Sequence, residues 1–122
     1  MTNRSYECIR LKLELLSSID YAMKIFIIKR MAEFDHWIDS LRDRPTRIRL
    51  LRRVEKAQRG LLGDINFVGD GVYEMREFFG PGWRMYYIQC GDTLIVMLGG
   101  GDKSSQVNDI LAAKALAVTL ME

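Results

Sequence analysis

The stretch "VYEMREFFGPGWRMYYIQCGDTLIVMLGG", Val72 to Gly100, decides the fold. It contains three β-rich runs, "VYEMREFF", "WRMYYIQC" and "TLIVMLGG". The first two are joined by Gly80-Pro81-Gly82, and the last two by Gly91-Asp92. Short glycine-containing connections between β-rich runs are typical of β-hairpins. The stretch therefore predicts an antiparallel meander of three strands.

Upstream of this meander the hydrophobic spacing changes to that of helices. "MKIFIIKR", residues 23–30, predicts a strand, and apolar residues at helical spacing predict a helix over 31–41. "RDRP" ends that helix, and Pro45 suits the first turn of a second helix, which "RGLLGD" ends at a glycine. The second helix is expected to bury one apolar stripe. Its members are Ile48, Leu51, Val54 and Ala57.

Downstream of the meander, Val107, Ile110, Leu111 and Ala117 indicate a closing helix, with Ser104 or Ser105 as its N-cap. The expected order is a strand, two helices, three strands and a helix. We therefore predict an α+β fold with a small twisted, mainly antiparallel sheet, an N-terminal helical hairpin and a C-terminal helix. Residues 23–122 form the expected domain. Residues 1–22 are interpreted as an N-terminal extension, or as an artefact of start-site choice, because Met23 is itself a possible start.

Length and composition place the chain among single-domain globular proteins. It has 122 residues and a formal net charge of +2. No apolar run approaches the roughly 20 residues that span a bilayer, so no membrane partner is expected. Cys8 and Cys90 are too few for a disulfide framework, and no Cys or His set has zinc spacing, so we expect reduced thiols and no metal.

The basic residues are concentrated in the second helix. Between Arg42 and Arg59 there are eight basic residues against two acidic ones. Such a stripe suits a polyanion or an acidic protein, and the alternative is a solvated helix face. Arg49, Arg53 and Lys56 follow each other at helical spacing, away from the expected apolar stripe, and are the candidate RNA-binding residues.

One face of the meander is expected to carry the chemistry. If Gly80-Pro81-Gly82 is a three-residue loop, Phe78 pairs with Arg84 and Arg76 pairs with Tyr86. Period two then places five residues on one face. They are Glu74, Arg76, Phe78, Arg84 and Tyr86. Guanidinium groups bind phosphate bidentately and can stabilise a phosphorane-like transition state. The alternative is that Arg76 or Arg84 merely pairs with Glu74 at the sheet edge.

The stretch "GGGDKSSQ", Gly99 to Gln106, resembles a phosphate-binding loop. It is not a Walker motif, because Asp102 stands where that motif requires glycine. Lys103 remains a candidate phosphate ligand before a helix N-terminus, and the alternative is a solvated lysine. The lone histidine, His36, is interpreted as structural, which leaves Glu74 or Tyr86 for proton transfer. Tyr73, Trp83 and Tyr87 alternate onto the opposite face and are expected to be core residues.

From about Met23 to Leu120 the chain resembles the RelE/ParE superfamily of toxins, and within it the branch of addiction-module killer proteins, or HigB-like toxins. The resemblance rests on Trp37 with Leu41-Arg42-Asp43, the Gly63-Asp64 turn, "YEMR" with "GPGWRMYY", and "GGGDKSSQ" followed by Asp109-Ile110. Carried over by position, Arg84 matches an arginine that contacts the scissile phosphate, Lys103 matches a basic position after the last strand, and Arg76 matches an arginine of the second strand.

This resemblance implies a cytoplasmic toxin of a type II toxin-antitoxin system, without a cofactor, which an adjacently encoded helix-turn-helix antitoxin neutralises. RelE-like members are mRNA interferases, metal-independent endoribonucleases that inhibit translation by cleaving mRNA on the ribosome. ParE-like members inhibit DNA gyrase instead, and a third alternative is an inactive antitoxin-binding module. The chain differs from RelE at Val72 and Glu74, where RelE has lysines, and it lacks a tyrosine in the closing helix.

Overall fold

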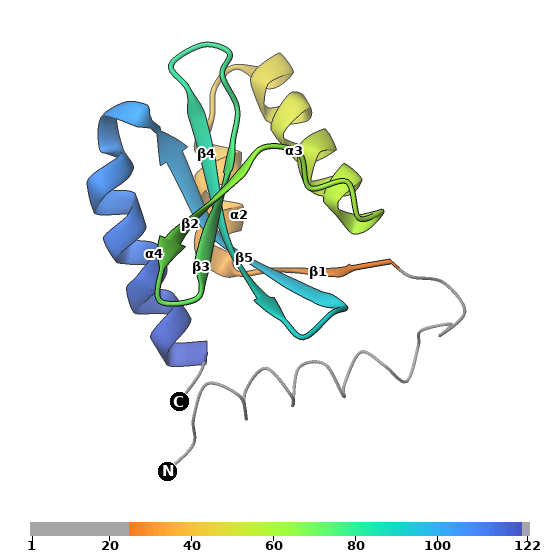
Figure 1. Cartoon of the computed structure of the whole chain (residues 1–122). Coiled ribbons are helices and arrows are strands. Elements are labelled where there is room, and N and C mark those ends of the chain that lie inside the picture. The colour runs from red at the N-terminus through yellow and green to blue at the C-terminus, as the bar shows by residue number, and fades with distance from the viewer. Residues whose placement is uncertain (1–24, 121–122) are drawn as a thin grey trace.

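The computed structural model describes residues 25–120, so the proposed extension 1–22 lies outside the described residues (Figure 1). The described part is an α+β fold with a five-stranded mixed sheet and a C-terminal helix, as the sequence predicts at this level. Its elements are β1 (Ile27–Arg30), α2 (Ala32–Ser40), α3 (Arg44–Gln58), β2 (Ile65–Gly69), β3 (Val72–Arg76), β4 (Trp83–Cys90), β5 (Leu94–Asp102), a 3-10 turn (Lys103–Ser105) and α4 (Gln106–Leu120).

The strand order in the sheet is β1-β5-β4-β3-β2. β2 to β5 form an antiparallel meander, and β1 adds parallel to β5. The sheet is therefore mainly antiparallel, but the meander has one strand more than we predict, because β2 is missing from the sequence prediction. β2 is a short edge strand in which the consecutive residues Asn66 and Phe67 are both exposed, so it lacks the alternating pattern that identifies a half-buried strand.

The β3–β4 register also differs from the prediction. Arg76 lies opposite Arg84, and Glu74 lies opposite Tyr86, because the connection is a longer loop over residues 77–82. This pairing is displaced by two residues from the expected one. A displacement by two keeps every side chain on its expected face, whereas a displacement by one would exchange the faces. Glu74, Arg76, Arg84 and Tyr86 consequently share a face despite the wrong register.

The glycine run is part of a strand and not of the phosphate-binding loop that its sequence resembles. β5 continues through Gly99, Gly100 and Gly101 to Asp102. A side chain at Gly100 would overlap the Trp37 ring, and one at Gly101 would overlap the Asp109 carboxylate, so close packing excludes larger residues there. The helix cap is also corrected. Asp102, and neither serine, caps the turn that leads into α4, because its carboxylate accepts the Ser104 N–H at 2.8 Å.

Helices cover both faces of the sheet (Figure 1), and an apolar layer lies between the sheet and the helices on each face. α2 and α3 pack on one face, where Phe34, Ile38 and Leu50 meet Met85 and Tyr87. α4 packs on the other face through its buried residues, Ala113, Ala117 and Leu120. α2 and α3 follow one another through a short break, and both lie against the sheet, so the predicted helical hairpin is present only in part. Asp43 caps α3, and Pro45 occupies its first turn as expected.

The buried stripes of two helices are rotated from their predicted positions. In α3, Leu50 and Arg53 are buried with Val54 and Ala57, while Ile48 is 40 % exposed. In α4, Val107 and Leu111 are 75 % and 61 % exposed. Apolar spacing alone does not fix which of two neighbouring stripes faces the sheet when both contain large residues. Cys90, at the end of β4, is disulfide-bonded, so the expectation of reduced thiols is wrong for it. Cys8 lies outside the described residues.

Candidate nucleic-acid interface

Arg76 and Arg84 flank an exposed aromatic ring. They lie opposite each other at the ends of β3 and β4, where the loop over residues 77–82 begins and ends. The Phe78 ring of that loop is centred 6.0 Å from the Arg76 guanidinium carbon and 5.9 Å from that of Arg84. Phe78 is nevertheless 72 % exposed. An exposed ring held beside two guanidinium groups can stack on a nucleobase, since every base has a π-face.

Arg84 is largely buried yet incompletely hydrogen-bonded. It is 7 % exposed, and its Nη1 donates to the Trp83 carbonyl at 3.3 Å. Its Nε lies 4.0 Å from Glu74 Oε2 and has no hydrogen-bond partner among the described residues. A buried donor without a partner costs free energy that an incoming anion or water can recover.

Glu74 holds this arrangement from below the surface. It is 1 % exposed and accepts hydrogen bonds from Gln106 Nε2 at 3.1 and 3.3 Å and from Asn66 Nδ2 at 3.3 Å. These bonds and Arg84 compensate the burial of its charge. The carboxylate therefore ties β3 to β2 and to the start of α4, and a polymer bound at the surface does not reach it in this conformation. Asn66 and Gln106 are not identified from the sequence. Asn66 reaches Glu74 through the β2–β3 pairing, and Gln106 reaches it through the packing of α4 on the sheet, and neither is visible in the sequence.

Arg76 pairs with Asp64 and not with Glu74. Its Nη2 and Nε donate to the two carboxylate oxygens of Asp64 at 2.9 and 3.2 Å. The hydrogen bond from Arg76 lowers the pKa of Asp64, and the same contact raises the pKa of Arg76. Both side chains are about one-third exposed. Arg76 thus keeps its charge and remains accessible beside the Phe78 ring.

Tyr86 is placed where proton transfer to a bound polymer is not possible in this conformation. Its side chain is fully buried, and its hydroxyl has no hydrogen-bond partner among residues 25–120. Burial raises the pKa of Tyr86 well above its ordinary value, and the charges of Glu74 and Asp109 raise it further. The phenol therefore stays protonated. Its position in the core beneath α4 makes it a packing residue.

Lys103 and Arg84 border the same glycine. A side chain at Gly82 would meet Lys103 Cβ at 3.5 Å and Arg84 Nη1 at 3.8 Å. Lys103 is exposed in the turn that leads into α4. The structure therefore brings together three of the predicted residues and Phe78. We call this group the basic loop cluster, and its members are Arg76, Phe78, Arg84 and Lys103.

The predicted RNA-binding residues of α3 divide into two kinds. Arg49 and Lys56 are exposed, and the Arg49 guanidinium lies 3.9 Å from the centre of the Phe79 ring, which connects α3 to the basic loop cluster. Arg53 is 9 % exposed and donates five hydrogen bonds within the protein. Arginine has five N–H donors, so none is left for a phosphate. The assignment of Arg53 to RNA binding therefore does not fit its environment.

The aromatic residues expected in the core lie in it or against it, whereas the histidine is exposed. Tyr73, Trp83 and Tyr87 belong to or pack against the core under α2 and α3, as predicted. The Tyr73 and Tyr87 rings stack with centroids 5.5 Å apart, and burial raises the pKa of Tyr87 to about 12. His36 is exposed on α2, so it is not a core residue.

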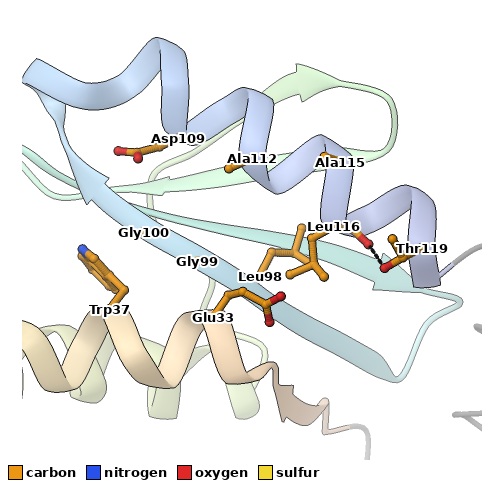
Figure 2. Close-up of a pocket in the computed structure, with 10 residues that line it drawn as sticks. All are labelled: Glu33, Trp37, Leu98, Gly99, Gly100, Asp109, Ala112, Ala115, Leu116 and Thr119. Atoms are coloured by element: carbon orange, nitrogen blue, oxygen red, sulfur yellow. Dashed lines mark hydrogen bonds between the residues drawn. The ribbon is translucent and has the colours of Figure 1, made fainter.

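A groove lies between α2 and α4, above the last part of β5 (Figure 2). This α2–α4 groove has a volume of about 540 Å³. Its floor is Leu98, Gly99 and Gly100, and Glu33 and Trp37 line it from α2. The α4 wall consists of Asp109, Ala112, Ala115, Leu116 and Thr119. The groove is distinct from the basic loop cluster, with which it shares no residue.

Comparison with known proteins finds one similarity to report. Neither a protein-family model nor a solved structure matches the chain. In residues 25–120 no helix has the length and apolar character needed to cross a membrane. A protein of Haemophilus influenzae (strain ATCC 51907 / DSM 11121 / KW20 / Rd), described as an uncharacterized protein, is 39 % identical over 93 residues, which cover 76 % of this chain and 94 % of the relative. The chain belongs to the same family as this Haemophilus influenzae protein.

Proposed function

We propose that the chain is the toxin of a type II toxin-antitoxin system, with a RelE/ParE-like fold, and that it cleaves translated mRNA on the ribosome. One observation carries the proposal: the basic loop cluster holds two guanidinium groups, a lysine and an exposed aromatic ring in one place. A phosphodiester and its neighbouring base need these two kinds of contact, a cationic one for the phosphate and a flat apolar one for the base.

In the proposed reaction the ribose 2′-oxygen attacks the adjacent phosphorus. The new 2′-O–P bond forms as the P–O5′ bond breaks, the 2′-hydroxyl loses its proton, and the leaving 5′-oxygen gains one. The products are a 2′,3′-cyclic phosphate and a 5′-hydroxyl. Arg84 and Lys103 stabilise the charge that develops on the phosphate oxygens, and Phe78 stacks on a base next to the scissile bond.

The buried groups limit what the chain itself contributes to proton transfer. Glu74 and Tyr86 are buried, and Asp64, at the surface of the cluster, is a weak base because Arg76 lowers its pKa. We therefore assign to the chain the binding and orientation of the RNA, and assign proton transfer to water and ribosomal groups. Orientation alone can supply a large part of a rate enhancement, provided that the ribosome holds the 2′-oxygen in line.

The proposed partners are ribosomal RNA and an antitoxin. Arg49 and Lys56 on the exposed side of α3 contact ribosomal RNA, because they extend the positive surface from the basic loop cluster along the helix. A helix-turn-helix antitoxin encoded next to the toxin gene neutralises the protein in the cytoplasm. This antitoxin follows from the family resemblance and not from a particular contact.

The test is induction of the protein in growing bacteria, followed by primer extension across translated and untranslated messages. New 5′ ends on translated messages alone are expected. Induced DNA breaks with intact messages would replace the proposal by gyrase inhibition, and unchanged growth would replace it by an inactive antitoxin-binding module.

Variants test the residues of the basic loop cluster. Phe78→Ala and Arg84→Lys are expected to abolish the new 5′ ends while the far-ultraviolet circular dichroism of the protein stays unchanged. Phe67→Ala is the matched control, because Phe67 is also an exposed phenylalanine but lies on β2, where it contacts Tyr73. Cleavage that survives both cluster variants would refute the site assignment.

A further inference from the structure

Among residues 25–120, the last part of β5 has a strand neighbour on one side only. β1 pairs with β5 over Leu94–Met97. The chain then turns away into α2 at Met31, whose N–H donates to the Met97 carbonyl at 3.0 Å. β5 continues to Asp102, and within the described residues only β4 pairs with this continuation, while Trp37 of α2 packs against Gly100. An unpaired strand edge is a template for a further strand.

The floor of the α2–α4 groove lets another backbone come close. Gly99 and Gly100 have no side chains to stand in the way. A Cβ at Gly99 would meet nothing within 4 Å, and the backbone there is not in the left-handed region, so the fold itself does not require glycine at this position. Gly100 differs, because the Trp37 ring packs directly against it. The space above Gly99 is open, and it lies at the free edge of β5.

The walls of the groove combine small and acidic side chains (Figure 2). Ala112 and Ala115 on α4 leave room for the side chains of an incoming strand. Glu33 lines the groove from α2. Asp109 lines it from the N-terminal end of α4, away from Glu33. The sequence of α2 contains Glu33, Asp35 and Asp39 and neither lysine nor arginine, although Arg30 just before the helix pairs with Asp35. This charge attracts a basic ligand and repels a polyanion such as RNA.

We propose that the α2–α4 groove binds an extended basic segment of a partner protein, which adds as a strand to the free edge of β5. Backbone hydrogen bonds to β5 give affinity that is independent of sequence, and Glu33 and Asp109 select lysine or arginine side chains. The alternating side chains of the segment point toward the small residues of α4 and toward α2. This inference does not depend on the proposed ribonuclease activity.

The experiment uses the full chain labelled with ¹⁵N and two capped heptapeptides, Lys-Val-Lys-Val-Lys-Val-Lys and Glu-Val-Glu-Val-Glu-Val-Glu. Their valines are the same and their charges are opposite. We expect the lysine peptide to shift the backbone amide resonances of residues 98–101 and of the facing parts of α2 and α4. The glutamate peptide is expected to cause no shifts there.

Two variants and a control decide the location. Gly99→Leu fills the open space above β5 without a clash and is expected to weaken the binding of the lysine peptide at least about tenfold. Glu33→Gln keeps the size of the side chain but removes its charge, and it is expected to weaken binding less than Gly99→Leu. Glu55→Gln, an exposed change on α3, is expected to leave binding unchanged. Shifts centred outside the groove, equal binding of both peptides, no shifts at millimolar peptide, or binding unaffected by both Gly99→Leu and Glu33→Gln would overturn the proposal.

Discussion

Arg53 is the residue whose environment differs most from what its sequence position suggests. It stands among basic residues of an exposed helix, yet its guanidinium joins three segments through the carbonyls of Leu62, Asp64 and Arg76, and it also pairs with Glu77. Gly63 makes room for it, because a Cβ at that position would lie 2.9 Å from the guanidinium carbon. A single buried arginine thus fixes the loop between α3 and β2 against the end of β3.

Arg53→Lys is expected to lower the free energy of unfolding by about 2 kcal/mol or more, because lysine keeps the charge but cannot reach several carbonyls in one plane. The neighbouring exposed change Arg52→Lys is the matched control and is expected to stay within about 0.5 kcal/mol. Urea denaturation of both variants measures the difference. Equal stability of the two variants would show that the five hydrogen bonds of Arg53 have no net value.

α3 has one face that packs on the sheet and another that is exposed and basic. Its buried side packs on the sheet through Leu50, Val54 and Ala57. Its exposed basic residues are Arg44, Arg49, Arg52 and Lys56, and the exposed Arg59 follows directly after the helix. Since Arg53 is buried, the exposed face is less basic than the sequence alone suggests. Its exposed basic residues still outnumber its acidic one, Glu55.

The combined change of Arg49, Arg52 and Lys56 to Gln is expected to weaken binding of a single-stranded RNA oligonucleotide. It should also reduce the slope of log affinity against log salt by about 2, because each lost phosphate contact removes about 0.7. Fluorescence anisotropy between low and physiological salt measures this slope. Lys29→Gln on β1 serves as the control, and a slope that is unchanged in the triple variant would exclude α3 from the RNA interface.

At the scale of elements, sequence periodicity predicts most of the fold and little of its detail. The three central strands, both helices before them and the closing helix are predicted because their patterns are long. β2 is missed because both faces of this edge strand are partly solvated. The buried stripes of α3 and α4 depend on which apolar residues the sheet accommodates, and that is a property of the assembled layers. The Asp64–Arg76 pair depends on the register of the β2–β3 hairpin, which is not predicted because β2 is missed.

For the candidate site, the residue types that bind phosphate are predictable, but their accessibility is not. Arg76 and Arg84 lie on one face, as the sequence predicts, since a register displaced by two preserves the faces of the sheet. Lys103 comes near Arg84 separately, because both border Gly82. Glu74 and Tyr86 share the same face but are covered by α4 and by the surrounding polar contacts. Which half of a sheet face a helix covers cannot be read from strand periodicity.

For the whole molecule, each of the two apolar layers encloses a tyrosine on adjacent positions of β4. Tyr86 lies under α4, and Tyr87 lies under α2 and α3. Burial raises the pKa of both above the ordinary value of 10, and that of Tyr87 reaches about 12. The unfolded chain therefore loses these protons at a lower pH than the folded chain. Stability from the two phenols is complete below about pH 10 and is lost as the pH rises above it.

Tyr86→Phe is expected to reduce this alkaline loss, because one of the two titrating phenols is removed. Between pH 10 and 12 the free energy of unfolding should fall less steeply in the variant, by up to about 1.4 kcal/mol per pH unit. At pH 7 the variant should be as stable as the parent or more so, since the buried hydroxyl has no partner among the described residues. Urea denaturation across this range tests the expectation. Identical slopes for both proteins would contradict it.

The parallel pairing of β1 with β5 has a consequence for how the protein is made. Ile27 finds its partner in Leu94, and Arg30 finds its partner in Met97, near the other end of the chain. During synthesis β1 leaves the ribosome long before β5 exists, so this part of the sheet closes only after β5 has been made. Contacts so distant in sequence also make folding slow. A nascent chain arrested before β5 therefore lacks both the β1–β5 pairing and Lys103, which borders the same glycine as Arg84.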